Sequence, residues 1–235
     1  MCGFLSYFQL RKNTNLPTRK KFKNSLLNQE SRGPDYSEIV IDKNFMIGHN
    51  RLSIRDLKKT SNQPFRKYDN FILLYNGEIY NTKTLINKLE ELDITFNKNS
   101  DTEILYELII NFGLEKTLNQ IKGMFSFVFI DITNQKIYTA RDHFGQKPLF
   151  YYLDKDQYVV STNINSITEI VDQPFEISRE TSLEYLSSRG QITPGYTFFK
   201  NIYNLEAGNY TMFNLNDLIF KKKRYFFVEN LIQEN

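Results

Sequence analysis

The chain opens with Met1-Cys2-Gly3-Phe4-Leu5-Ser6-Tyr7-Phe8, in which the only cysteine of 235 residues directly precedes an apolar run. The run from Gly3 to Phe8 predicts a buried strand that leads straight out of the N-terminus. Removal of Met1, which is efficient when the second side chain is small, would leave Cys2 with a thiol and a free α-amine. That amine has a pKa near ~8 and can act as a base at neutral pH. The stretch therefore indicates either an N-terminal nucleophile with its own base or an inert, buried cysteine.

Composition indicates a packed protein rather than a disordered one, because 40% of the residues are hydrophobic and 15% are aromatic. A single cysteine excludes an internal disulfide and fits the reducing cytoplasm, which is the location we expect. No apolar run approaches the roughly 20 residues of a membrane span. The short apolar stretch at the N-terminus ends at Arg11 and Lys12, which is unlike a signal peptide. We therefore expect no membrane partner.

The net charge of +3 comes with two basic clusters, Arg19–Lys21 and Lys221–Arg224. Such clusters can bind nucleic acid or phosphate groups, but no nucleic-acid motif accompanies them here. Solvated surface is the favoured interpretation, with the second cluster on a hairpin edge. The chain has no P-loop and no GxGxxG motif, and two histidines with one cysteine cannot form an ordinary structural zinc site. We expect no metal site and no nucleic-acid partner.

Predicted strands outnumber predicted helices, and the helices fall into separate clusters along the chain. The tripeptide Asn76-Gly77-Glu78 predicts a turn at the end of a strand, and either Ser100 or Asp101 can cap the helix that follows it. This pattern indicates an α+β layered fold in one domain. Strands are predicted at 3–8, 38–42, 45–48, 71–75, 124–131, 136–141, 149–153, 157–161, 209–214 and 218–226, and helices at 18–29, 84–92, 101–112, 164–170 and 181–187.

Seven short motifs follow one another in a distinctive order: Met1-Cys2-Gly3, Arg32-Gly33-Pro34-Asp35, Gly48-His49-Asn50-Arg51-Leu52-Ser53-Ile54, Tyr75-Asn76-Gly77-Glu78-Ile79-Tyr80-Asn81, Ser100-Asp101-Thr102-Glu103, Gly123-Met124-Phe125-Ser126-Phe127 and Arg141-Asp142-His143-Phe144-Gly145-Gln146-Lys147-Pro148-Leu149. Each motif alone would be weak, but seven in register are highly specific. Together they resemble the class II glutamine amidotransferase domain, the glutaminase half of asparagine synthetase B-type proteins. The likeness runs from Met1 to about Phe226.

The resemblance implies a four-layer αββα sandwich of two antiparallel sheets flanked by helices, as in N-terminal-nucleophile hydrolases. We expect residues 1–235 to form this one domain. Similar proteins usually continue into a synthetase domain with a Ser-Gly-Gly-x-Asp-Ser type loop, and this chain has no such signature. ATP and magnesium are therefore expected only for a separate synthetase domain or partner, not for this chain. An excised glutaminase domain and a stand-alone subunit both fit the sequence.

The resemblance also implies the catalytic residues. Cys2 matches the family nucleophile, whose thiolate would attack the side-chain amide of glutamine while its own amine moves the proton. Asn76 and Gly77 match the oxyanion hole, through the Asn76 side-chain amide and the Gly77 N–H. Glycine at position 77 would allow close approach of the backbone to substrate. A simple type I′ hairpin turn is the structural alternative for Asn76-Gly77.

The implied substrate-binding residues are Arg51, Leu52, Ile54, Glu78 and Asp101. Arg51 matches the arginine that grips the substrate α-carboxylate, and Glu78 and Asp101 match the acidic positions near the α-ammonium. Taken alone, a surface ion pair would explain Arg51 and a helix cap would explain Asp101. The segment around Arg141, Asp142 and Lys147 is interpreted as structural, a turn and ion-pair network that supports the sheets. His49 and His143 are interpreted as non-catalytic.

The predicted function is hydrolysis of the side-chain amide of L-glutamine through a Cys2 thioester. This gives glutamate, and ammonia for an asparagine-synthetase-like amide transfer. The alternative is a catalytically silent glutamine-binding or regulatory subunit of an ATP-dependent synthetase. A third reading keeps the fold but changes the amide substrate; Arg51 and Asp101 argue against it because they suit a free amino acid. The expected partners are L-glutamine and a synthetase domain or subunit, and a homodimer is possible.

Overall fold

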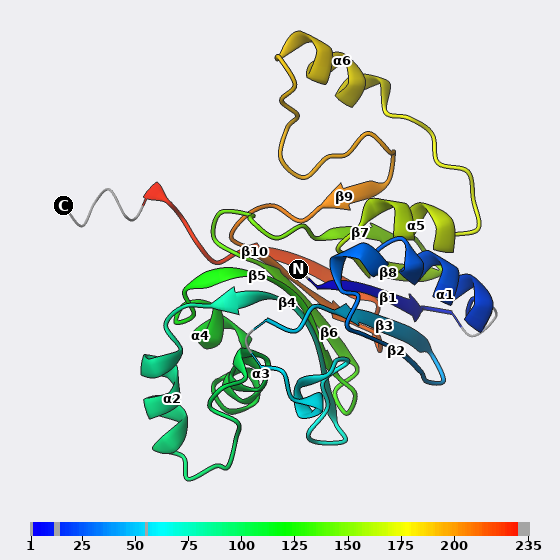
Figure 1. The fold of residues 1–235 in the computed structure, drawn as a ribbon. Helices are drawn as coiled ribbons and strands as arrows, with labels where there is room; N and C mark the ends of the chain where they lie inside the picture. Colours follow the sequence, from blue (N-terminus) through cyan, green and yellow to red (C-terminus); the bar gives the residue numbers. More distant parts are fainter. Residues whose placement is uncertain (1, 12–14, 55, 230–235) are drawn as a thin grey trace.

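The computed structural model describes residues 2–11, 15–54 and 56–229, whose strands form two antiparallel sheets (Figure 1). We name them sheet A, with strand order β2-β3-β1-β8-β7-β9, and sheet B, with strand order β11-β10-β6-β5-β4. The strands of sheet A are β1 Gly3–Gln9, β2 Tyr36–Ile41, β3 Phe45–Arg51, β7 Phe150–Leu153, β8 Gln157–Ser161 and β9 Ile202–Asn204. The strands of sheet B are β4 Phe71–Ile79, β5 Gly123–Asp131, β6 Lys136–Arg141, β10 Asn209–Asn214 and β11 Ile219–Arg224.

Helices cover the outer faces of both sheets. Helices α1 and α5 pack together over sheet A, while α2, α3 and α4 lie beside sheet B, and α6 stands away from the sheets (Figure 1). None of the helices in the described ranges combines the length and apolarity needed to cross a bilayer. The helices are α1 Arg19–Leu27, α2 Thr82–Glu90, α3 Asp101–Phe112, α4 Leu114–Leu118, α5 Ile164–Ile170 and α6 Arg179–Ser187, with 3₁₀ turns η1 Glu30–Arg32 and η2 Lys59–Ser61.

The pleat of β1 divides its side chains between two cores. Phe4 and Phe8 point toward sheet B, where they join the core between the two sheets. Leu5 and Tyr7 point the other way and pack with Phe22 and other side chains beneath α1 and α5. Because successive side chains of a strand face opposite sides, a strand buried on both faces reads as the continuous apolar run that opens this chain.

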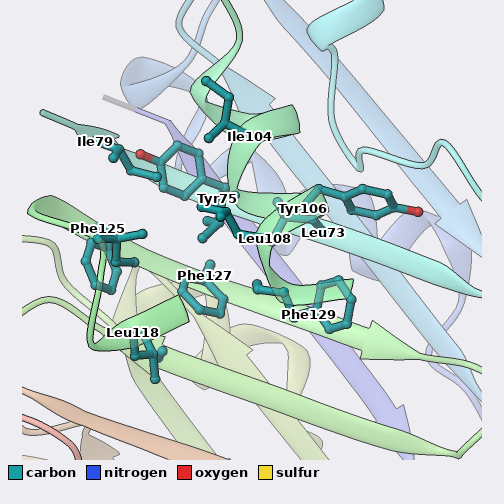
Figure 2. Close-up of a cluster of buried hydrophobic side chains, with 14 of the residues drawn as sticks. Leu73, Tyr75, Ile79, Ile104, Tyr106, Leu108, Leu118, Phe125, Phe127 and Phe129 are labelled. Atoms are coloured by element: carbon teal, nitrogen blue, oxygen red, sulfur yellow. The ribbon is translucent and has the colours of Figure 1, made fainter. Parts of the chain in front are cut away.

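The same alternation operates in β4. Leu73 and Tyr75 face the helices and pack with Ile104 of α3 and Phe127 of β5 (Figure 2). Leu74 faces sheet A and joins the core between the sheets. The molecule therefore has four layers, helix, sheet, sheet and helix, as the family resemblance implied.

The prediction for the end of β4 was wrong. Asn76, Gly77 and Glu78 do not form a turn; they continue β4 and pair with Ser126, Phe125 and Met124 of β5. An Asn-Gly pair favours a turn when it lies between two strands that pair with each other. Here the partner strand lies more than 40 residues downstream, and its apolar residues extend the ladder past the Asn-Gly pair.

The remaining predicted elements are confirmed within one to a few residues, with two omissions. The prediction missed α4, a five-residue helix, and β9, a three-residue strand, because both are too short to show a periodic pattern. The cap of α3 is Ser100, whose hydroxyl accepts a hydrogen bond from Glu103 N at 3.3 Å. Because Ser100 rather than Asp101 caps this helix, the Asp101 side chain can make other contacts.

One buried histidine connects the two sheets. His49 of β3 is fully buried, and its Nε2 donates a hydrogen bond to the carbonyl oxygen of Tyr75 in β4 at 3.1 Å. Its Nδ1 has no hydrogen-bond partner among the described residues. Burial, with a smaller contribution from the positive charge of Arg51, lowers the pKa of His49 to about 4, although the hydrogen bond to Tyr75 opposes the shift. His49 is therefore neutral at pH 7, and its non-catalytic role stays a prediction.

We expect His49 to make the folded protein sensitive to acid. The unfolded chain binds a proton at this residue below a pKa of about 6.5, whereas the folded chain does so only near pH 4. Stability therefore falls as pH drops through this window, by about 2 kcal/mol between pH 6.5 and pH 5. His49→Gln, whose amide can still donate to Tyr75, should remove most of this loss in urea denaturation measured at both pH values.

His143→Gln is the matched control. Burial also lowers the pKa of His143, but this side chain is only half-buried and contacts aromatic rings rather than the other sheet. Its replacement should change the acid loss less than His49→Gln does. An acid loss that is equal in His49→Gln and in the unmodified protein would contradict the assignment.

Candidate active site

A cavity of about 130 Å³ lies where β1 begins and β4 ends, and Cys2 lines it. By the pleat of β1, position 2 falls on the same side as Phe4, toward sheet B. By the pleat of β4, Asn76 and Glu78 fall on the same side as Leu74, toward sheet A. The cavity thus receives side chains from both sheets. All eight residues that the sequence predicted for the site line it: Cys2, Arg51, Leu52, Ile54, Asn76, Gly77, Glu78 and Asp101.

The Cys2 thiol is held at the wall of the cavity by the backbone that follows β3. Its Sγ accepts a hydrogen bond from Leu52 N at 3.5 Å and lies 3.8 Å from Leu52 O. The Cys2 carbonyl oxygen accepts a hydrogen bond from Arg32 Nε at 3.2 Å. Burial raises the pKa of the thiol, while the Leu52 N–H and the charge of Arg51 act in the opposite direction. The thiol therefore needs a base or nearby positive charge to ionise at neutral pH.

The free edge of β4 presents the Gly77 N–H to this cavity. Phe125, the partner of Gly77 in β5, directs its own N–H and carbonyl toward Asp142, at 3.2 and 2.8 Å. In an antiparallel ladder such a residue is not hydrogen-bonded to its partner. The N–H and carbonyl of Gly77 must therefore point away from β5, toward the open edge. The sequence had suggested that Gly77 lies in a turn. In the structure its outward N–H belongs to the edge of the strand itself.

Side chains form hydrogen bonds with the outward backbone groups of the residues two positions before and two positions after Gly77. Gln63 contacts both edge groups of Tyr75, accepting from its N–H at 2.6 Å and donating to its carbonyl at 3.1 Å. The Ile79 N–H donates to Asp101 Oδ2 at 3.3 Å. The edge is thus capped two residues before and two residues after Gly77. Edge strands carry backbone groups that need partners, and here the capping confines the open section to Gly77.

Gly77 has no room for a side chain, for a reason other than the predicted one. A Cβ at this position would lie 2.4 Å from the carbonyl oxygen of Met124 and 2.8 Å from Phe125 Cα. The obstruction is the backbone of β5, not the substrate side of the strand. Close packing of the two strands, rather than access for a ligand, requires glycine here.

Asn76 supplies a second donor to the cavity. The residue is 1% exposed, and its Nδ2 has no hydrogen-bond partner in the described part of the chain. Leaving a buried amide nitrogen unpaired costs about 1–3 kcal/mol, so such a group is unusual in a folded protein. The unpaired Asn76 Nδ2 and the outward Gly77 N–H belong to adjacent residues of the same cavity wall.

Arg51 is buried, not part of a surface ion pair. Its guanidinium donates to the Lys58 carbonyl at 3.0 Å, to Asn62 Oδ1 at 2.7 Å and to the Asp56 carbonyl. It therefore anchors the loop between β3 and β4 while it lines the cavity. Some of the guanidinium donors that we expected to bind a substrate carboxylate therefore bind the protein's own loop.

The two acidic residues approach the cavity from different sides of β4. Asp101, at the start of α3, accepts a hydrogen bond from Tyr75 Oη at 3.1 Å in addition to the one from Ile79 N. Glu78 belongs to the face of β4 that is directed at sheet A. They therefore form two separate acidic positions rather than one cluster.

The sequence interpretation missed several residues that line the cavity or support it. Asp35 of the Arg-Gly-Pro-Asp motif accepts a hydrogen bond from Ser53 N at 2.7 Å and so supports the segment that holds Cys2. Gln63 and Ser61 line the cavity from the loop before β4, and Lys147 lines it from the segment after β6. Gln63 and Ser61 lie outside every recognised motif, and no sequence pattern marked them.

We expect Gly77→Ala to destabilise the protein by about 2–3 kcal/mol, because the added methyl group meets fixed backbone. The control is Gly48→Ala. A Cβ there would meet the side-chain ends of Leu26 and Phe22, which can shift, so its cost should be about half as large. Urea denaturation of the two variants measures the difference. A Gly77→Ala variant as stable as Gly48→Ala would contradict the close strand packing.

The family model that matches the chain is described as a glutamine amidotransferase domain, and it matches residues 1–226. Among curated proteins, asparagine synthetase [glutamine-hydrolyzing] 3 of Bacillus subtilis is 29% identical over 93% of this chain and 36% of its own length. Asparagine synthetase [glutamine-hydrolyzing] 2 of the same organism is 32% identical over 86% of this chain and 27% of its own length. The chain thus spans about a third of the length of these relatives.

Among solved structures, the fold is similar to that of glutamine phosphoribosylpyrophosphate (PRPP) amidotransferase from B. subtilis. The TM-score is 0.67, with 19% sequence identity, and the match covers 96% of this chain and 49% of the other. At this identity the likeness concerns the fold alone. It confirms the predicted α+β arrangement of two antiparallel sheets between helices.

Proposed function

The chain belongs to the glutamine amidotransferase domain family, and we propose that it hydrolyses the side-chain amide of L-glutamine with Cys2 as the nucleophile. The observation that carries the proposal is the pair of donors at adjacent residues, the unpaired Asn76 Nδ2 and the outward Gly77 N–H, in the cavity that Cys2 lines. An amide hydrolase needs a nucleophile and fixed donors for the oxyanion in one place.

In the proposed mechanism the α-amine of Cys2 accepts the thiol proton, and the sulfur attacks the amide carbon of glutamine. The α-amine is available only after removal of Met1, which lies outside the described residues. The amide oxygen becomes an oxyanion that accepts hydrogen bonds from Asn76 Nδ2 and Gly77 N. Collapse of this intermediate expels ammonia, which takes its proton from the Cys2 ammonium, and leaves a γ-glutamyl thioester. Water then hydrolyses the thioester and releases glutamate.

The remaining cavity residues suit a free amino acid. In this proposal Arg51 directs part of its guanidinium at the α-carboxylate while it holds the loop. Glu78 and Asp101 provide negative charge for the α-ammonium from the two sides of β4. Leu52 and Ile54 contact the apolar part of the substrate. None of these steps calls for a cofactor, and the expectation that this chain uses neither ATP nor magnesium stays a prediction.

We further propose that the ammonia serves an amide transfer by an ATP-dependent synthetase, whether as another domain or as a partner subunit. The support is that two relatives are asparagine synthetases described as glutamine-hydrolyzing and that this chain matches about a third of their length. Asparagine formation, a cytoplasmic location and a homodimer also remain predictions.

A coupled assay for glutamate release, with intact mass recorded on the same sample, tests the proposed reaction. We expect Met-free protein to release glutamate and Cys2→Ala to be inactive. Full activity in Cys2→Ala would overturn the assignment. A Met-free protein that binds glutamine without releasing glutamate would support the regulatory alternative instead.

The oxyanion donors have their own test. Removing one donor of this kind typically lowers kcat by about 10²–10³, and we expect this for Asn76→Ala. Ser126→Ala is the matched control, because Ser126 is the partner of Asn76 in β5 and its hydroxyl is also buried without a partner among the described residues. That variant should keep kcat within about threefold. Equal losses in both variants would indicate a packing effect rather than oxyanion stabilisation.

A further inference from the structure

Lys147 is an almost buried residue whose side chain lines the catalytic cavity. The residue is 5% exposed and lines the same cavity as Cys2. Within the described ranges its Nζ has no hydrogen-bond acceptor and no ion-pair partner. A lysine enclosed to this degree without an ionic partner is uncommon in folded proteins, and the reaction proposed so far makes no use of it.

The segment that carries Lys147 is fixed from both ends. The Asp142 carboxylate accepts four backbone hydrogen bonds at 2.9–3.2 Å, including the one from Lys147 N. Arg141 donates from Nε to the Lys147 carbonyl at 2.7 Å and from Nη2 to the Gly145 carbonyl at 2.7 Å. These contacts are hydrogen bonds to backbone, not the predicted ion-pair network. They hold the backbone of Lys147 in a fixed position beside the cavity.

A second cation on the same side of Cys2 also has a free donor. Arg32 binds the Cys2 carbonyl through Nε, while its buried Nη2 has no partner in the described residues. Three other charged groups of the cavity are engaged: Arg51 binds its loop, Asp101 binds Tyr75 and Ile79, and Asp56 accepts hydrogen bonds from Ser61 and Asn97. Glu78 also lines the cavity and is the acidic group that could pair with Lys147. The charged or titratable groups that face Cys2 or Lys147 are the Cys2 α-amine, Arg32, Arg51, Asp56, Tyr75, Glu78, Asp101, Asp142 and Lys147.

We propose that Lys147 is a positioning residue for the Cys2 thiolate, and that its ammonium supplies positive charge which helps the partly buried thiol to ionise and attack near neutral pH. The inference rests on the proposed function, because it assigns the role of a charge in that reaction. It is consistent with the pKa of Lys147, which burial and Arg32 lower and which negative charge at Asp142, and to a smaller extent at Cys2 and Glu78, raises. A positive charge at Lys147 favours a negative charge at Cys2 in turn, and it adds to the stronger influence of the Leu52 N–H and Arg51 on the pKa of the thiol.

Alkylation of the thiol by iodoacetamide, followed by intact mass as a function of pH, tests this role without any substrate. Cys2 is the only cysteine, so the label reports on this thiol alone. Loss of a positive charge from the wall of the same cavity should raise the midpoint of the alkylation profile by about one pH unit in Lys147→Met. The rate below the midpoint should fall only about threefold, because a thiolate of higher pKa is intrinsically more reactive.

Two variants serve as comparisons. Lys147→Arg keeps the charge and should restore a midpoint close to that of the unmodified protein. Lys43→Met removes the same charge from an exposed position between β2 and β3 and should leave the midpoint unchanged. If Lys147→Met does not fold, Lys147→Gln takes its place. In steady-state assays Lys147→Met should lower kcat while the KM for glutamine stays within about twofold.

An unchanged midpoint in folded Lys147→Met, or an equal shift in Lys43→Met, would overturn the inference. So would a shift that disappears in a Glu78→Gln background, because Lys147 would then neutralise Glu78 rather than support the thiolate. A shifted midpoint in a protein that releases no glutamate would support the role of Lys147 and overturn only the proposed function.

Discussion

The site depends on one backbone constraint, the hydrogen bonding of the free edge of β4. An edge strand must satisfy its outward N–H and carbonyl groups or leave them to a ligand. Gln63 and His49 form hydrogen bonds with the outward backbone groups of Tyr75, and the Asp101 carboxylate accepts one from the N–H of Ile79. Gly77 lies between these two capped positions, so its N–H is fixed in direction by a rigid ladder. A donor held in this way needs no reorganisation when negative charge develops in front of it.

The two sheets bring Cys2, the proposed nucleophile, to that edge through strand alternation. Cys2 follows the inward face of β1, and Asn76 follows the inward face of β4, so the core between the sheets continues into the cavity. His49 ties β3 to β4 at the same place. The apolar core and the polar site are thus neighbouring parts of one interface. This arrangement explains why residues 74 positions apart in the sequence can act together without a flexible loop between them.

Much of this arrangement could be predicted from the sequence, because strand and helix periodicities are strong and the seven motifs have a fixed order. The family resemblance implied that Cys2, Asn76 and Gly77 belong to one site, and all three line the same cavity. The sequence-based prediction was wrong where contacts between distant segments determine the structure. The Asn76-Gly77 pair favours a turn locally, but pairing with Ser126 and Phe125 keeps it in a strand. Lys147 was interpreted as structural because burial and the lack of an acceptor are not visible in a sequence. Short elements such as α4 were not predicted because they have too few residues to show a helical period.

The most direct measurement is a crystal structure of the protein after reaction with an electrophilic glutamine analogue that carries a diazoketone in place of the side-chain amide. The account predicts one adduct, on Cys2 Sγ, with the ketone oxygen about 2.7–3.1 Å from both Asn76 Nδ2 and Gly77 N. An adduct oxygen that points away from these donors, or a label attached elsewhere than Cys2, would contradict the account.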